Sequence, residues 1–269
     1  LQNMQAIQTI KKISAEKLPP ILVLSGDDIG QFEWMKEQLL KKVGYDSSDL
    51  NYSYFDMKET AYSEVELDLV SLPFFADEKI VILDHFVDVT TAKKRYLTDD
   101  ELQSFEGYLS APLETTRLIV FAEGKLDSKR RIVKLLKRDA QVLEATELKE
   151  QELRAHFTEE IKSLGLAIDS PAFEQLLIKS GFDFSEIQKN LEFLKTYKGA
   201  SSITISDIEE AIPKTLQDNL FDLIQMILKK QIDPARSLVK DLRLQGEDEI
   251  KLLAILLSQF RVYTQVKLL

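Results

Sequence analysis

The side chains that could perform chemistry in this sequence are few, and most lie around one predicted strand end. His85 follows the apolar run 79–84, and Asp84 and Asp88 lie beside it. A histidine in such a place could act as a general base, because active sites of α/β folds gather at the carboxyl ends of strands. The two carboxylates could hold Mg²⁺, but no phosphate-binding loop is present for the ion to organise. His156 belongs to another predicted domain, and we interpret both histidines as structural.

Motifs for nucleophilic and metal chemistry are missing as well. The sequence has no cysteine, which excludes thiol nucleophiles, disulfides and thiolate metal sites together. Neither a Gly-x-Ser-x-Gly elbow nor a His-Glu-x-x-His pair occurs. We therefore expect no catalytic activity from this chain alone, no catalytic residue, no metal ligand and no cofactor.

The turn between the first predicted strand and the helix after it lacks the groups that bind phosphate. Residues 21–26 form an apolar run typical of a buried strand, and residues 29–43 carry the apolar spacing of a helix. In nucleotide-binding α/β domains this turn carries several glycines and a Lys-Ser/Thr pair. Here residues 25–28 read Ser-Gly-Asp-Asp, and the two carboxylates would repel a phosphate. The sequence predicts an ATPase scaffold that cannot bind ATP.

The composition is that of a folded protein with more than one domain. The 269 residues are 44% hydrophobic and carry a net charge of −10, so the chain can bury a sizeable core. A negatively charged protein is poorly suited to grip a nucleic acid on its own. The first residues do not read as a signal peptide, and no apolar run reaches membrane-spanning length. We expect a cytoplasmic protein that does not enter a membrane.

Short β-branched runs alternate with helix-length segments in the first half of the chain. The predicted strands are 21–26, 51–55, 79–84, 118–121 and 140–143, and the predicted helices are 29–43, 63–71, 99–109 and a basic helix that ends near residue 138. Such alternation is typical of βαβ units in a mostly parallel sheet that is covered on both faces. We therefore predict an α/β domain over residues 1–145.

Strand signals fade after this point. The segments with helical spacing are 150–164, 170–180 and 183–197, and the residue pairs placed as helix starts are Ser170-Pro171 and Ser206-Asp207. We predict a small helical domain over residues 146–213.

The last segment, residues 214–269, continues as helices. One apolar stripe consists of Leu216, Leu220, Leu223, Ile224, Ile227 and Leu228. Residues 250–257 are apolar nearly all round, and such a helix must be buried on every side. We expect this segment to be the first part of a truncated helical domain that packs against further helices, its own or a partner's.

Basic residues cluster on and just before the helix that ends near residue 138. They are Lys125, Lys129, Arg130, Arg131, Lys134, Lys137 and Arg138, and the apolar positions between them are Ile132, Val133, Leu135 and Leu136. This cluster could contact DNA phosphates or an acidic partner. A solvated helix face explains the same pattern and is the reading that we favour.

Two adjacent aromatic residues lie where a loop normally carries polar ones. Residues 71–79 read Ser-Leu-Pro-Phe-Phe-Ala-Asp-Glu-Lys, between a predicted helix and a predicted strand. Both rings could fold back into the core. Neighbouring side chains of an extended or turn backbone point in different directions, however, so at least one of Phe74 and Phe75 is hard to place inside. An exposed aromatic pair is a candidate anchor for a hydrophobic pocket on a partner.

Several segments together resemble the delta subunit family of the bacterial replicative DNA polymerase III clamp loader. They are residues 19–28 (PPILVLSGDD), 72–82 (LPFFADEKIVI), 125–130 (KLDSKR), 134–137 (KLLK), 190–197 (NLEFLKTY) and 259–261 (QFR). The resemblance follows the order of the family along nearly the whole chain.

The resemblance implies an AAA+-like α/β domain of the P-loop NTPase type with a degenerate nucleotide site, followed by a helical lid domain and a helical collar that assembles the loader. It also implies a subunit that neither binds nor hydrolyses ATP and that acts in DNA replication as part of the polymerase holoenzyme. The family's hydrophobic tip, which binds the sliding clamp and helps to open the ring, matches Leu72, Phe74 and Phe75. The implied partners are the sliding clamp, the other loader subunits and primed DNA within the assembly.

Two other functions stay open. One is a nucleotide-dependent enzyme with an atypical phosphate site, and it requires that the chain bind ATP. The other is a degenerate AAA+ structural subunit that shares the fold but makes no contact with a clamp.

Overall fold

The computed structural model describes residues 4–199 and 201–267, with side chains through residue 261. These residues form two compact units. The sheet unit comprises the chain up to Gly165 together with Phe182–Leu191, and the helical unit comprises Leu166–Gly181 together with the chain from Glu192 onward. The division into three domains at residues 145 and 213 stays a prediction.

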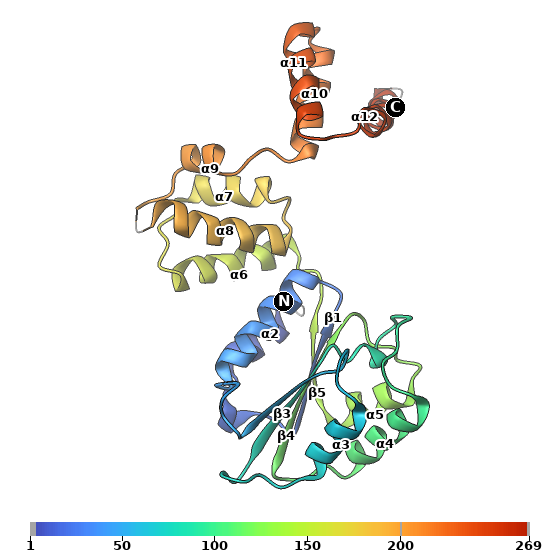
Figure 1. Cartoon of the computed structure of the whole chain (residues 1–269). Helices are drawn as coiled ribbons and strands as arrows, with labels where there is room; N and C mark the ends of the chain where they lie inside the picture. The colour runs from blue at the N-terminus through green and yellow to red at the C-terminus, as the bar shows by residue number, and fades with distance from the viewer. Residues whose placement is uncertain (1–3, 200, 268–269) are drawn as a thin grey trace. The chain divides into compact units, whose positions relative to one another are not determined.

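Five parallel strands form the sheet of the sheet unit (Figure 1). They are β1 (Ile21–Gly26), β2 (Tyr52–Asp56), β3 (Lys79–Asp84), β4 (Thr116–Glu123) and β5 (Gln141–Ala145). The order across the sheet is β2-β3-β4-β1-β5, and every pairing is parallel. Each strand lies within two residues of its predicted position. For β1, β3 and β4 the reason is that buried parallel strands read as continuous apolar runs.

Helices cover both faces of this sheet. They are α1 (Gln5–Lys12), α2 (Ile29–Lys42), α3 (Tyr62–Val70), α4 (Asp99–Ser110) and α5 (Arg131–Asp139). The sheet unit also contains α6 (Glu150–Ser163) and the short 3₁₀ helices η1 (Ala15–Lys17) and η2 (Val87–Val89). Figure 1 shows α2 on one face and α3, α4 and α5 on the other. Sequence analysis assigned no element to residues 5–12, although Ile7 and Ile10 of α1 are fully buried.

The interior strand β1, between β4 and β5, shows why the sheet needs two helical layers. Ile21 and Val23 belong to the core cluster that includes Phe105 of α4 and Ile132 of α5. Leu22 and Leu24 point to the opposite face, where α2 packs, and they are buried just as fully. Burial on both faces explains the unbroken apolar run in the sequence.

The helical unit is built from α7 (Ser170–Lys179), the second part of α8 (Phe184–Lys198), α9 (Ile205–Ala211), α10 (Leu216–Leu228), α11 (Ile232–Leu244) and α12 (Glu249–Lys267). The predicted start at Ser170 is correct, with Asp169 as the N-cap. The start at Ser206 is one residue late, because Thr204 and Asp207 form a capping box around a helix that begins at Ile205. None of the described helices combines the length and the apolar character needed to cross a bilayer.

The predicted apolar faces of α10 and α12 are only partly covered within the helical unit. Leu220 and Leu223 are buried, whereas Leu228 is 54% exposed. In α12, Leu252 packs into a small core with Leu220 and Leu242, but Ile250 is 79% exposed. The described residues of this unit therefore do not bury the helix on every side.

Candidate functional site

The turn after β1 is shaped by close packing. Gly26 has φ +131°, a backbone conformation that favours glycine. A Cβ at Gly26 would lie 2.1 Å from the carbonyl oxygen of Ala145, so the turn passes directly against the end of β5. Close packing against β5 therefore explains why this turn contains a glycine, without any bound ligand.

Asp28 caps the N-terminus of α2, which is the place where a phosphate binds in nucleotide-binding α/β domains. Its Oδ1 accepts the backbone N–H of Gln31 at 3.0 Å. Burial, and then the charges of Asp183, Glu147 and Asp27, raises the pKa of Asp28 in spite of that hydrogen bond. The sequence interpretation of Asp28 as a helix N-terminal residue is confirmed, and a bound anion would have to displace it and approach its neighbouring charges.

A pocket of about 540 Å³ opens at this turn within the sheet unit. Its lining consists of Asp27, Asp28, Ile29, Gly30, Glu147, Leu148, Leu153, Phe182, Asp183, Phe184 and Ser185. Four of these are acidic, and in the described part of the chain no lysine or arginine lines the pocket. A Cβ at Gly30 would lie 2.1 Å from Oγ of Ser185, so the first turn of α2 is in close contact with the start of α8. The pocket has the wrong charge for a polyphosphate.

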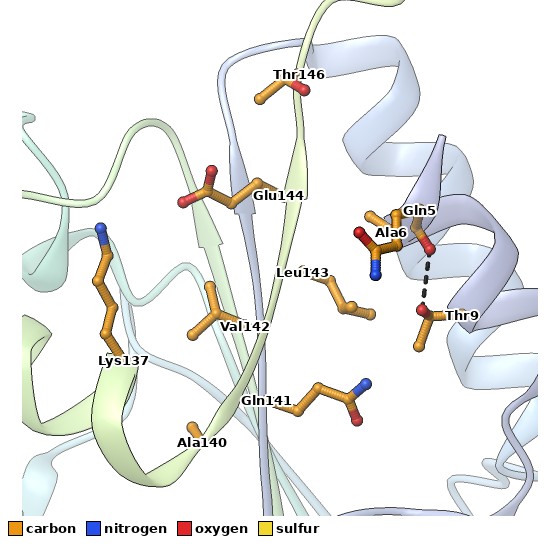
Figure 2. A pocket seen from close by; sticks show the side chains of 10 residues that line it. All are labelled: Gln5, Ala6, Thr9, Lys137, Ala140, Gln141, Val142, Leu143, Glu144 and Thr146. Carbon is orange, nitrogen blue, oxygen red and sulfur yellow. Dashed lines mark hydrogen bonds between the residues drawn. The ribbon is translucent and has the colours of Figure 1, made fainter. Parts of the chain in front are cut away.

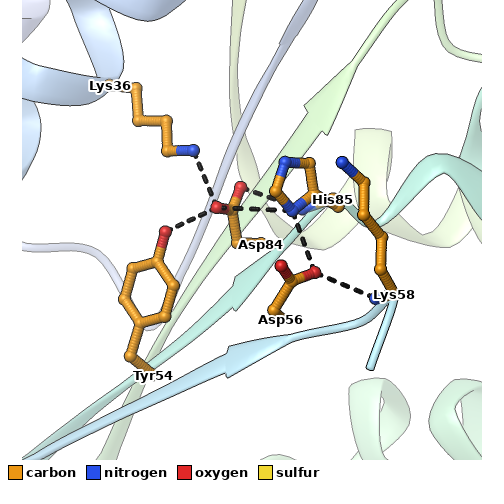
Figure 3. Close-up of polar contacts among 6 residues, drawn as sticks. All are labelled: Lys36, Tyr54, Asp56, Lys58, Asp84 and His85. Carbon is orange, nitrogen blue, oxygen red and sulfur yellow. Dashed lines mark hydrogen bonds and ion pairs between the residues drawn. The ribbon is translucent and has the colours of Figure 1, made fainter. Parts of the chain in front are cut away.

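A lysine neutralises the acidic strand end that sequence analysis considered for Mg²⁺ (Figure 3). Nζ of Lys36, on α2, lies 2.7 Å from Oδ2 of Asp84, and the hydroxyl of Tyr54 donates to the same oxygen at 2.5 Å. Burial and this hydrogen bond raise the pKa of Tyr54. Sequence analysis missed the ion pair because Lys36 lies 48 positions before Asp84, and no local pattern connects them.

Asp84 and Asp88 do not share a site. Oδ1 of Asp88 accepts the backbone N–H groups of Tyr96 and Leu97, at 2.9 and 3.0 Å. No group of three or more potential metal ligands occurs among the residues that the structure describes. Each of the two carboxylates therefore has partners of its own.

His85 joins the ends of two neighbouring strands. It has φ +55°, and its Nδ1 lies 2.9 Å from Oδ1 of Asp56, the last residue of β2 (Figure 3). Burial raises the pKa of Asp56, but hydrogen bonds from the backbone of Lys58 and from His85 outweigh it and leave the pKa below its usual value.

His156 is fully buried, and neither ring nitrogen has a hydrogen-bond partner in the described part of the chain. Its ring lies edge-on to Trp34 at 4.7 Å between centroids, stacks on Phe184 at 5.0 Å and contacts Phe157 at 4.8 Å. Burial, aided by the charge of Lys11, lowers the pKa of His156 to about 3. His156 is therefore neutral at physiological pH and belongs to an aromatic cluster.

The basic cluster before and on α5 is partly neutralised. Arg131 lies 3.4 Å from Glu106, and Arg138 lies 2.7 Å from Asp139. Ile132, Val133 and Leu136 are buried on the inner face of the helix. The lysines Lys125, Lys129 and Lys134 are exposed. This is the arrangement of a solvated amphipathic helix, and its three exposed lysines are accessible to an acidic partner.

A second groove, of about 630 Å³, follows the outer edge of β5. Figure 2 shows α1 with Gln5 and Thr9 on one side of the strand and Lys137 on the other. Oγ1 of Thr9 donates to the carbonyl oxygen of Gln5 at 2.9 Å. The polar side chains are divided between the two sides of the strand, with Lys137 and Glu144 on one and Gln5 and Thr9 on the other (Figure 2), so they provide no convergent set for a small ligand.

The aromatic pair between α3 and β3 is exposed. Phe74 and Phe75 are 86% and 75% exposed, and Leu72, two residues before Phe74, is 65% exposed. The two rings lie 6.4 Å apart between centroids with 44° between their planes. The alternative in which both rings fold back into the core is therefore excluded. We call residues 71–78 the tip segment.

Comparisons with known proteins agree with this architecture. The family model described as "DNA polymerase III, delta subunit" matches residues 22–146, which include the sheet and the tip segment. The model described as "DNA polymerase III delta subunit, C-terminal domain" matches residues 217–269.

Individual relatives cover almost the whole chain. The DNA polymerase III subunit delta of Bacillus subtilis (strain 168) is 26% identical over 260 residues, which are 96% of this chain and 75% of that protein. The solved structure of the Bacillus subtilis DNA clamp loader delta protein matches with a TM-score of 0.64 and 25% identity, over 96% of this chain and 76% of that one. The match and the helix-covered parallel sheet confirm the predicted AAA+-like fold class. The chain therefore belongs to the family of DNA polymerase III delta subunits.

Proposed function

We propose that this chain captures the sliding clamp through Leu72, Phe74 and Phe75 and helps to open the ring for loading onto primed DNA. As a delta subunit of DNA polymerase III, it is a component of the clamp loader and assembles with the other loader subunits. Its place of action is the cytoplasm, where the chromosome is replicated.

The observation that carries this proposal is the exposure of both rings of the tip segment. Phe74 and Phe75 are 86% and 75% exposed, and a soluble protein gains nothing from two adjacent rings in water. Burial of each ring in a partner's pocket is worth about 1.5–3 kcal/mol. Such a concentration of apolar area in two side chains is typical of a binding hot spot.

Ring opening needs no chemistry from this chain. If the tip segment binds the clamp more tightly when one clamp interface is sprung, binding shifts the clamp toward that state by the difference in affinity. ATP hydrolysis by other loader subunits would then control when the tip segment is accessible.

We expect no saturable ATP binding and no ATPase activity from this chain. Its pocket at the β1 turn is lined by Asp27, Asp28, Glu147 and Asp183, which repel a triphosphate, and the carboxylate of Asp84 is paired with Lys36. Equilibrium titration with a fluorescent ATP analogue in the presence of Mg²⁺ measures this directly. Micromolar binding that is lost when Asp28 is replaced would contradict the proposal and favour the nucleotide-dependent enzyme.

Titration of this chain against purified sliding clamp from the same organism tests the main proposal. We expect a saturable complex in the absence of nucleotide, because the tip segment is already exposed in the isolated chain. Lack of any complex at high micromolar concentration would favour the structural subunit without clamp contact.

Contact with DNA in the assembled loader would depend on the basic cluster before and on α5. Replacement of Lys125, Lys129 and Lys134 by glutamine should leave clamp binding unchanged and reduce the salt dependence of DNA binding by the assembled loader. An unchanged salt dependence would assign these lysines to a solvated face.

A further inference from the structure

One buried lysine connects the two ends of the tip segment. We propose that Lys79 is a positioning residue that holds Leu72, Phe74 and Phe75 in a fixed arrangement before the clamp binds. The inference rests on the proposed clamp-binding function of these side chains, but the fastening itself can be measured without the clamp.

Lys79 begins β3 at the end of the tip segment, and its side chain reaches back to the start of that segment. Nζ of Lys79 donates to Oγ of Ser71 at 2.8 Å and to the carbonyl oxygen of Asp68. The same Nζ lies 3.6 Å from Oδ1 of Asp68. These contacts bring the last turn of α3 against the first residue of β3, so the tip segment is a loop closed at its base.

The surroundings of Lys79 show that this contact is a specific one. The residue is only 5% exposed, and burial of an ammonium group is costly unless its three donors find acceptors. The backbone carbonyl of Asp68 and the hydroxyl of Ser71 accept two of them, and the carboxylate of Asp68 places a negative charge 3.6 Å from the ammonium nitrogen. A positive charge at the carboxyl end of α3 is also favoured by the helix dipole.

Asp68 in turn depends on Lys79. Oδ2 of Asp68 is buried and has no hydrogen-bond partner in the described part of the chain, so the ammonium group is the charge that compensates this carboxylate. A neutral residue at position 79 would leave the carboxylate uncompensated. The side chain of Asp68 is 26% exposed, so water reaches part of the carboxylate, but hydration of the buried Oδ2 would require the base of the loop to open.

A second contact fastens the same end of the segment from the surface. Nε of Arg117, on β4, donates to Oε2 of Glu78 at 3.1 Å, and a terminal guanidinium nitrogen of Arg117 contacts Oε1. The Arg117 bonds hold the pKa of Glu78 below its usual value. Since both side chains are partly exposed, solvent weakens this pair, and Lys79 is the stronger restraint.

A fixed base matters because an aromatic pair on a flexible loop must be ordered when it binds. That ordering cost reduces affinity, whereas a preorganised loop avoids it. Lys79 therefore acts on clamp binding through the arrangement of the tip segment and does not need to touch the clamp.

The test compares Lys79→Met with the unaltered chain. In the free protein we expect the amide hydrogens at positions 71 and 79, which are bonded to the carbonyl oxygens of Asp68 and Thr115 at the base of the loop, to exchange about tenfold faster, while those of β4 are unchanged. We expect the clamp to bind about tenfold more weakly, measured at a temperature where circular dichroism shows both proteins folded. Lys42→Met, at an exposed lysine of α2, is the matched control and should change neither quantity.

A double variant separates two effects of Lys79→Met. One is the loss of the Lys79 contacts at the base of the loop, and the other is the loss of the charge that compensates the Asp68 carboxylate. Asp68→Asn with Lys79→Met has no uncompensated carboxylate, so it should recover the melting temperature lost in Lys79→Met, while the amide hydrogens at positions 71 and 79 still exchange fast and the clamp still binds weakly. Recovery of full clamp affinity by this double variant overturns the inference, and so does unchanged exchange in Lys79→Met. Failure of the proposed function gives a different result, namely clamp binding that survives removal of both rings.

Discussion

Replacement of Phe74 and Phe75 together by alanine is expected to weaken clamp binding by about 3–6 kcal/mol, at about 1.5–3 kcal/mol for each ring buried. This corresponds to a loss of more than about a hundredfold in affinity. The melting temperature should hardly change, because the rings are 86% and 75% exposed in the free chain. Isothermal titration calorimetry against the clamp and thermal unfolding followed by circular dichroism give both quantities.

Two further variants define the comparison. Phe193→Ala removes an aromatic ring that is 49% exposed in the helical unit, and it should leave clamp affinity unchanged. Phe105→Ala removes a fully buried ring and should cost about 3–5 kcal/mol of stability. A Phe74/Phe75 double variant that unfolds like the Phe105 variant would show that the tip segment supports the fold, and one that binds the clamp normally would remove the basis of the proposed function.

The free energy of unfolding is expected to fall steeply as the pH is lowered from 6.5, because of His156. In the folded chain burial lowers the pKa of this histidine from 6.5 to about 3. Between these two values the unfolded chain binds a proton that the folded chain does not, so stability decreases as the pH falls. The stabilisation is fully present above pH 6.5 and is lost down to about pH 3. At ~1.4 kcal/mol per pKa unit, the loss reaches up to about 5 kcal/mol.

The matched variant is His156→Phe, which keeps an aromatic ring between Trp34 and Phe184 and has no proton to bind. Urea denaturation at several pH values should show that the variant loses much less stability than the unaltered chain between pH 6.5 and about 4.5. Buried or paired carboxylates such as Asp207, whose pKa is held at about 2, contribute mainly at lower pH and are common to both proteins. Parallel pH profiles of the two proteins would show that His156 takes up its proton without unfolding the chain.

The sequence by itself determined the architecture of the sheet unit and the character of its turn. Parallel strands buried on both faces must be apolar throughout, so β1, β3 and β4 could be recognised from composition alone. The carboxylates at residues 27 and 28 exclude a phosphate cradle without reference to any other segment. The sequence also indicated that at least one of the neighbouring Phe74 and Phe75 is hard to place inside, since adjacent side chains diverge; the structure shows that both rings are exposed.

Only the tertiary structure decided which polar side chains meet. Lys36 neutralises Asp84 from 48 positions away, and Asp88 faces backbone groups instead of Asp84. In the sequence Lys79 looks like an ordinary polar residue at the start of a strand, but in the folded chain it is buried. The spacing of apolar residues shows which side of one segment faces the core, whereas an ion pair depends on how several segments pack together.

His156 is a second side chain whose surroundings could not be read from the sequence. The sequence suggested a structural histidine, but it could not show that the ring lies between aromatic residues of α2 and α8 with both nitrogens desolvated. The pKa of a histidine depends on the dielectric and charges around it. Those surroundings come from residues that are distant in sequence, so they exist only once the chain has folded.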